Sequence, residues 1–292
     1  VSVGDVWLFT GQSNMDYTTK RFNFTGEDTA NIKLFTVPDI NAASSDFTKP
    51  QQTLPGGSWV DCTQTNAENF SAVGYLTGKA LADAFPDVPI GLVSDNVPGT
   101  AIERWMSNEA RAELGITAQS NDLYNGMIAP LAGTKFSGVV WYQGESNVNG
   151  FASYKDYLTG MVADWRSLLD SPELPFIVIQ LPGYYTDITA LLREAQMQAA
   201  DESNHIYMTC NIDTGDQYDI HPYDKDIVSG RVADTILAKV YGREDVSCDY
   251  PTVRDITPSG STLTVTFDNV YDGLQKIREE EAIGGFLVAG GD

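Results

Sequence analysis

The sequence predicts an α/β fold of three layers, in which a central parallel sheet lies between two layers of helices. Short apolar runs rich in β-branched and aromatic residues alternate with longer amphipathic segments along the chain. Most of these runs are continuously apolar, as expected for strands that are buried on both faces. Strand and helix patterns alternate until about residue 250, and this alternation is typical of a parallel sheet.

Six apolar runs are expected to form the strands of this sheet. They cover residues 6–9, 32–37, 90–93, 139–142, 176–181 and 206–212. Four segments with apolar residues at a spacing of three to four are expected to form helices. They cover residues 70–81, 151–168, 188–199 and 227–240. Proline pairs mark the ends of two of these helices before the next strand, at Pro86 and Pro89 and at Pro172 and Pro175.

The chain beyond residue 249 follows a different pattern. Residues 261–267 alternate between polar and apolar and follow a Pro-Ser-Gly turn, which predicts a β-hairpin. Residues 284–292 are expected to lie in another strand. The 292 residues suffice for one large α/β domain with a fragment left over. We therefore expect an α/β domain over residues 1–249 and a partial β-rich segment over residues 250–292.

The composition excludes several classes of function. The chain has 18 basic and 40 acidic side chains, a formal charge of −22, which repels phosphate backbones and anionic lipid surfaces. We therefore expect neither a nucleic-acid partner nor a membrane partner, and no apolar run is long enough for a membrane helix. The three cysteines lack the spacing of metal ligands, and phosphate-binding loops and dinucleotide fingerprints are absent. We expect no metal and no cofactor.

Polar residues follow several of the predicted strands at the points where the strands end. Ser13 follows the first strand in a Gly-Gln-Ser-Asn corner, and Gly99 and Gln143 follow two later strands. His221, one of only two histidines, lies on a polar loop after the last strand. The carboxyl ends of parallel strands share one edge, where α/β sheets bind their ligands. Because a serine becomes a nucleophile when an imidazole reaches it, this pattern predicts a hydrolytic site.

Each of these residues also has a structural interpretation. A serine before a helix is most often an N-cap, and Gly99 could be an ordinary turn glycine. Glu145 could form an ion pair with Arg104 rather than take part in chemistry. Ser146 is a rival nucleophile of lower rank. His205 enters an apolar strand and is interpreted as a structural residue.

Three motifs resemble those of the SGNH (GDSL-type) hydrolases, and more narrowly those of their sialate O-acetylesterase branch. They are Gly-Gln-Ser-Asn-Met at residues 11–15, Trp-Tyr-Gln-Gly-Glu-Ser-Asn at residues 141–147 and Asp-Ile-His-Pro at residues 219–222. The resemblance covers roughly residues 3–242 and implies a flavodoxin-like α/β/α fold with a central parallel sheet. Members of this branch often carry extra β modules, which fits the segment after residue 250.

The resemblance implies a serine esterase that removes O-acetyl groups from carbohydrates through an acetyl-serine intermediate, without a cofactor. Ser13 is then the nucleophile and His221 the general base. The oxyanion is held by the N–H groups of Ser13 and Gly99 and by the Gln143 amide. The possible supporting residues are Glu145, Asn14 and Arg104.

The acid that orients His221 is left open by the sequence. The superfamily pattern places an aspartate three residues before the histidine, where this chain has Tyr218. Asp219, two residues before His221, is our first choice. Asp213, Asp216 and a Ser–His pair steadied only by a backbone carbonyl are the alternatives.

Three functional hypotheses follow, each with an acetylated glycan as the expected partner. The first is a sialate O-acetylesterase, whose pocket needs a cation for the substrate carboxylate; Arg104 is the nearest candidate by sequence. The second is an esterase of acetylated xylan or another plant polysaccharide, since the acidity of the chain favours neutral glycans. The third is a catalytically inactive carbohydrate-binding module. We expect a secreted or periplasmic protein, and the sequence does not indicate its oligomeric state.

Overall fold

The computed structural model describes residues 3–40, 47–117, 120–184, 187–271 and 273–274. They belong to two compact units, Val1–Cys248 and Asp249–Asp292. In the second unit, strands β8 (Thr252–Ser259) and β9 (Thr262–Asp268) pair as an antiparallel hairpin. The predicted hairpin is therefore present, whereas the strand expected at residues 284–292 lies outside the described residues.

The first unit is built on a seven-stranded sheet of order β3-β2-β4-β1-β5-β6-β7. Its strands are β1 (Asp5–Gly11), β2 (Thr29–Thr36), β3 (Val60–Cys62), β4 (Ile90–Asn96), β5 (Gly138–Tyr142), β6 (Phe176–Ile179) and β7 (Ile206–Thr209). All neighbours are parallel except β2 and β3. The predicted α/β class and all six predicted strands are confirmed. The sheet is not parallel throughout, because its edge strand β3 runs antiparallel to β2. This strand was not predicted, since a segment of three residues is too short to show a pattern.

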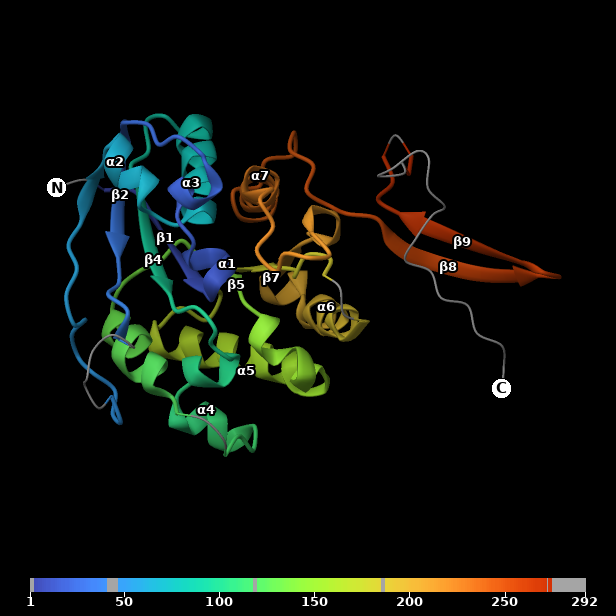
Figure 1. Cartoon of the computed structure of the whole chain (residues 1–292), viewed down its shortest axis with the longest axis horizontal. Helices are drawn as coiled ribbons and strands as arrows, with labels where there is room; N and C mark the ends of the chain where they lie inside the picture. Colours follow the sequence, from blue (N-terminus) through green and yellow to red (C-terminus); the bar gives the residue numbers. More distant parts are fainter. Residues whose placement is uncertain (1–2, 41–46, 118–119, 185–186, 272, 275–292) are drawn as a thin grey trace. The chain divides into compact units, whose positions relative to one another are not determined.

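Two pairs of packed helices cover the sheet, one on either side of it in Figure 1. One pair is α3 (Ala72–Ala84) with α7 (Lys225–Thr235), and the other is α5 (Phe151–Leu168) with α6 (Asp187–Ala199). These are the four predicted helices, the last continued by a π-helical turn, η9 (Ile236–Val240). The short helices α1 (Ser13–Asp16), α2 (Gln64–Glu68) and α4 (Asn108–Glu113) were not predicted, since they are too short to show helical periodicity.

Bulky aromatic side chains fix the turn that follows β5. Trp141 on this strand is fully buried and stacks edge-to-face with Trp105 and Trp165, with ring centroids 5.9 and 5.8 Å apart. Each such pair adds about 0.5–1.5 kcal/mol beyond the burial of its surface. The polar turn that begins at Gln143 is therefore attached to a rigid part of the core.

Strand β1, which lies between β4 and β5 in the sheet, ends at a glycine. Gly11 has a φ of +145°, and a Cβ there would lie 2.1 Å from the carbonyl oxygen of Tyr142, so that no other residue fits. The Gly11 carbonyl accepts a hydrogen bond from the N–H of Val97 (3.1 Å), and the N–H of Gln12 donates to the carbonyl of Tyr142 (3.1 Å). The turn after β1 is thus bonded to both neighbouring strand ends, and Ser13 follows it at the carboxyl edge of the sheet.

One carboxyl group is buried in β4 without compensation. Asp95 is fully buried, and neither side-chain oxygen has a hydrogen-bond partner among the described residues. Burial, together with the charge of Asp39, raises the pKa of Asp95 from 3.8 to about 8. Because the folded pKa lies above the unfolded value, stability that is fully present below about pH 4 is lost as the pH rises toward 8.

We therefore expect Asp95→Asn, which keeps the shape but cannot ionise, to gain stability over the wild type as the pH rises. The margin in unfolding free energy should grow by roughly 1 kcal/mol per pH unit between pH 4 and 8 and then level off. Urea unfolding at several pH values measures it, with Asp87→Asn on an exposed loop as the control. A margin that does not change with pH would contradict the prediction.

Candidate active site

Ser13 and His221 meet at the carboxyl edge of the sheet. Ser13 is the first residue of α1, and His221 lies in the loop before α7. The Ser13 Oγ lies 2.8 Å from the Nε2 of His221, although 208 positions separate the two residues. Ser13 is 7% exposed, and the His221 side chain is 20% exposed. This is hydrogen-bonding distance, so the imidazole can accept the proton of the hydroxyl group.

The surroundings of His221 favour its neutral form. Burial lowers the pKa of the imidazole, the charge of Asp219 raises it, and the charges of Arg21 and Lys225 lower it; the net change is downward. The ring also packs against Tyr17, with centroids 4.6 Å apart. A neutral imidazole is the form that can act as a base.

Only one of the three candidate acids lies beside the imidazole. The Oδ1 of Asp219 accepts a hydrogen bond from the backbone N–H of His221 (2.8 Å). The same oxygen lies 3.8 Å from the Nδ1 of the His221 ring. The second distance is too long for a hydrogen bond but lets the carboxylate act on the ring through its charge. Both oxygens of Asp213 bind Arg231, and Asp216 accepts backbone N–H groups of its own turn.

Two backbone N–H groups of the candidate site have no acceptor among the described residues. The N–H groups of Ser13 and Gly99 bond to no other described residue. Gly99 has a φ of +71°, is exposed, and a Cβ there would meet nothing within 4 Å. These groups can therefore donate to a bound oxyanion without breaking an existing bond.

The side-chain amide of Gln143 forms hydrogen bonds within the protein, whereas the prediction had it donate to the oxyanion. It is fully buried, and its Nε2 donates to the carbonyl of Thr100 (3.0 Å) and to the Oδ1 of Asn147 (2.7 Å). Its Oε1 accepts the hydroxyl of Tyr154 (2.8 Å). Both amide hydrogens have acceptors, so in this arrangement Gln143 is not a free oxyanion donor. It instead ties the loop that carries Gly99 to the end of β5.

Asn14, directly after Ser13, joins three parts of the candidate site. Its Nδ2 donates to the Oε1 of Glu145 (2.5 Å) and to the carbonyl of Ile220 (2.9 Å), the residue before the histidine. Its Oδ1 accepts from the ammonium group of Lys225 (2.8 Å). The side chain of Asn14 thus holds the histidine loop against α1.

Lys225 is a residue of this site that sequence reasoning missed. It is fully buried at the start of α7, with its Nζ 4.9 Å from the ring centre of Phe22. Burial lowers its pKa to about 8, and burial raises the pKa of Glu145. Because Lys225 stands between Asp224 and Asp226 in the sequence, the local pattern is that of a solvated helix start. No local signal could have revealed its burial.

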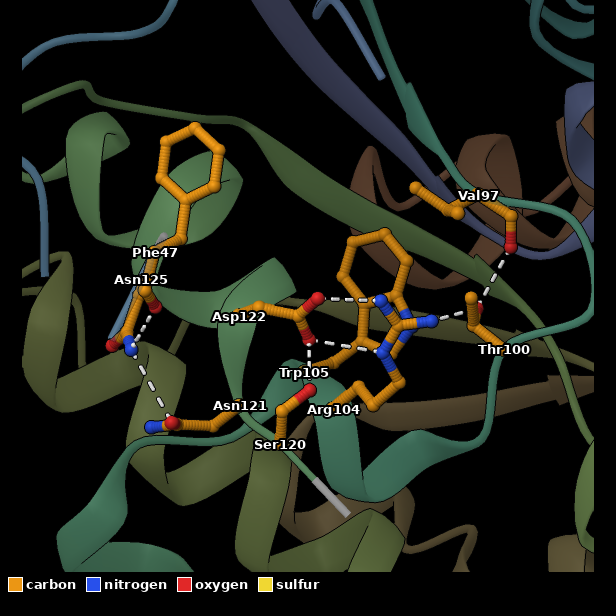
Figure 2. Close-up of polar contacts among 9 residues, drawn as sticks. All are labelled: Phe47, Val97, Thr100, Arg104, Trp105, Ser120, Asn121, Asp122 and Asn125. Atoms are coloured by element: carbon orange, nitrogen blue, oxygen red, sulfur yellow. Dashed lines mark hydrogen bonds and ion pairs between the residues drawn. The ribbon is translucent and has the colours of Figure 1, made fainter. Parts of the chain in front are cut away.

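Arg104 pairs with an acid that the sequence did not suggest. Figure 2 shows its guanidinium beside Asp122, with Nε–Oδ1 and Nη2–Oδ2 distances of 3.0 and 2.6 Å. Burial alone would raise the pKa of Asp122, but the hydrogen bonds from Arg104 and Ser120 hold it below its usual value. The alternative ion pair between Arg104 and Glu145 is therefore wrong, and the charge of Arg104 is compensated.

The remaining candidates lie in other settings. The Nδ1 of His205 lies 3.2 Å from the hydroxyl of Tyr207 at the start of β7, and Ser146 is exposed. In the part of the chain that the structure describes, no three His, Cys, Asp or Glu residues are grouped so as to hold a metal ion. Among the same residues, no helix has the length and apolarity needed to cross a bilayer.

Comparison with known proteins assigns this architecture to a family. Residues 3–223 match the model of the carbohydrate esterases described as sialic acid-specific acetylesterases. Sialate O-acetylesterase from Homo sapiens is 28% identical over an alignment of 294 positions, and the match covers 86% of this chain and 56% of that protein. The enzyme from Mus musculus is 28% identical over an alignment of 339 positions, and the match covers 92% of this chain and 62% of that enzyme. The chain spans little more than half the length of these relatives.

Solved structures agree with this assignment. A carbohydrate acetylesterase from Xanthomonas citri has a TM-score of 0.78 and 33% identity, covering 91% of this chain and 63% of that one. A protein from Arabidopsis thaliana has a TM-score of 0.57 and 17% identity, covering 80% of this chain and 98% of that one. The second similarity concerns the fold alone.

Proposed function

Because this chain belongs to the sialic acid-specific acetylesterase family of carbohydrate esterases, we propose that it is a serine esterase that removes O-acetyl groups from carbohydrates. The observation that carries the proposal is the 2.8 Å contact between the Ser13 Oγ and the His221 Nε2. The N–H groups of Ser13 and Gly99, which bond to no other residue in the described part of the chain, are available beside this contact. A serine, a neutral imidazole and backbone donors are together sufficient for acyl transfer.

In the first half of the proposed reaction, the Ser13 Oγ attacks the acetyl carbonyl carbon while the His221 Nε2 takes the hydroxyl proton. The negative charge that forms on the carbonyl oxygen is stabilised by the N–H groups of Ser13 and Gly99. One such donor is typically worth about 3 kcal/mol of the barrier. The intermediate then collapses, the ester C–O bond breaks, and the imidazolium protonates the sugar oxygen that leaves.

In the second half, a water molecule attacks the acetyl-serine and gives its proton to His221. Collapse of the second intermediate returns the proton to the Ser13 Oγ and releases acetic acid, which ionises to acetate in solution. Asp219 is proposed to stabilise the imidazolium through its charge, since its carboxylate lies 3.8 Å from Nδ1. Gln143 is proposed to act indirectly, by holding the loop of Gly99.

The substrate class rests on the relatives and on charge. The relatives from Homo sapiens and Mus musculus are sialate O-acetylesterases, which supports an acetylated sialic acid as the substrate. A neutral acetylated polysaccharide such as xylan is the second candidate, because the chain carries a net charge of −22 and Arg104 is already compensated by Asp122. We propose that the protein acts outside the cytosol, where such glycans are exposed.

A substrate panel tests the proposal. Acetate release is measured from p-nitrophenyl acetate, O-acetylated sialic acid and acetylated xylo-oligosaccharides. Release from any of the sugars, with labelling of Ser13 by an active-site phosphonate, supports the esterase. Glycan binding without acetate release and without labelling would instead establish the inactive binding module.

The pH dependence of the reaction follows from the environment of His221. Burial lowers its pKa below the usual 6.5, and the reaction needs the neutral ring. We expect kcat/KM for p-nitrophenyl acetate to stay constant down to below pH 6.5 and then to fall with a single protonation. Asp219→Asn removes a charge that raises this pKa, so the acid limb of that variant should lie at lower pH still. An acid limb above pH 6.5 in the wild type would contradict this account.

A further inference from the structure

An arginine lies one aromatic ring away from the general base. Tyr17 follows α1, and its ring packs against the imidazole of His221 at a centroid distance of 4.6 Å. Arg21 lies in the short helix η1 (Thr19–Phe22), and its guanidinium carbon is 3.8 Å from the centre of the same tyrosine ring. The guanidinium and the imidazole therefore contact the same tyrosine ring. Arg21 is also close enough for its charge to lower the pKa of His221.

Arg21 is a cation of this region that is available to a ligand. Its side chain is exposed, and it forms no ion pair with any residue that the structure describes. Two other cations of this region are already engaged: Arg104 binds Asp122 through two hydrogen bonds, and Lys225 is fully buried against Asn14. Lys20, in the same short helix as Arg21, is exposed as well.

The contact with Tyr17 prepares the guanidinium for an anion. Stacking on an aromatic face restrains the long side chain but leaves its N–H edge free to donate. That edge matches a carboxylate, which can accept two parallel charge-assisted hydrogen bonds. Since part of the ordering is complete before binding, less entropy is lost when a ligand arrives.

We infer that Arg21 binds the carboxylate of an acidic O-acetylated sugar, such as a sialic acid, while the acetyl ester of the same sugar lies at Ser13. This inference rests on the proposed function and adds to it the residue that selects an anionic substrate. Arg21 counteracts the net negative charge of the protein at the one place where an anionic sugar must approach. In this inference Arg21, and not Arg104, supplies the cation for the substrate carboxylate.

The test compares two substrates that differ only in charge: an O-acetylated sialic acid and its C1 carboxamide. Acetate release from both is measured at pH 7.5 for the wild type, Arg21→Gln and Lys20→Gln. Lys20 is the matched control, because it is an exposed cation in the same turn and its loss changes the net charge equally. We expect Arg21→Gln to lower kcat/KM about tenfold more for the acid than for the carboxamide, mainly through KM, as loss of one charge-assisted contact predicts.

Two further results are expected. Arg21→Lys should retain part of the preference, since it keeps the charge but loses the planar fork. Added salt should reduce the preference of the wild type for the acid and leave Arg21→Gln unaffected. Equal losses for both substrates in Arg21→Gln, or the same selective loss in Lys20→Gln, would overturn the inference. A wild type that hydrolyses the carboxamide but not the acid would also overturn the inference. Absence of acetate release from every acetylated sugar would instead overturn the proposed function itself.

Discussion

Replacing Ser13 by alanine is expected to lower kcat for acetate release by about 10⁴-fold or more while leaving the fold intact. The substitution removes the oxygen that lies 2.8 Å from the His221 Nε2, and with it the atom proposed to carry the acetyl group. The backbone N–H of residue 13 is retained, so the loss reports the nucleophile rather than the oxyanion donor. Hydrolysis of p-nitrophenyl acetate measures the effect, and thermal unfolding confirms that the protein is folded.

Ser146→Ala is the matched control for this variant. Ser146 is an exposed serine in the Trp-Tyr-Gln-Gly-Glu-Ser-Asn motif. The imidazole of His221 bonds to Ser13 and not to this residue. We expect its loss to change kcat by less than about twofold, as for a surface residue outside the reaction. Near-normal activity of Ser13→Ala, or a comparable loss in Ser146→Ala, would refute the assignment of the nucleophile.

Replacing Lys225 by methionine is expected to lower the unfolding free energy by about 3 kcal/mol at pH 7, where the lysine is charged. Methionine fills a similar volume but leaves the Glu145 carboxylate without its nearby cation. One oxygen of Glu145 is already buried without a partner among the described residues. The pKa of Glu145 is raised by burial and lowered by the charge of Lys225, so it rises further in the variant. Stability should therefore be closer to the wild type at pH 5 than at pH 7.

The double variant Lys225→Met with Glu145→Gln separates charge from shape. It removes both charges and keeps both volumes, so most of the stability lost in Lys225→Met should return at pH 7. Urea unfolding of the wild type, both single variants and the double variant gives the coupling free energy. Additive losses, or a Lys225→Met variant as stable as the wild type, would show that the buried lysine and the carboxylate do not interact.

The fold was predictable because its signals are local. The runs that form β1, β4, β5 and β6 are almost continuously apolar. This pattern is expected for strands that are covered on both faces. The edge strand β3 and the one-turn helix α1 left no such signal, because a segment of three or four residues is too short for a period. Their structure depends on what they pack against.

The site was predictable in part. Ser13, Gly99 and His221 follow strand ends, and the shared edge of a parallel sheet brings such positions together. The roles of the surrounding side chains were not predictable in the same way. Gln143 donates to Thr100 and Asn147 rather than offering a free amide.

By itself, the sequence determined the α/β class, the order of its main elements and the polar residues that terminate its strands, because patterns of a few neighbouring residues encode them. Only the tertiary structure decided which charges face one another. Lys225 is buried against Asn14, Arg104 binds Asp122, and Arg21 remains exposed beside Tyr17. These pairings depend on the packing of distant segments and on the solvent that packing excludes, and no local pattern records either.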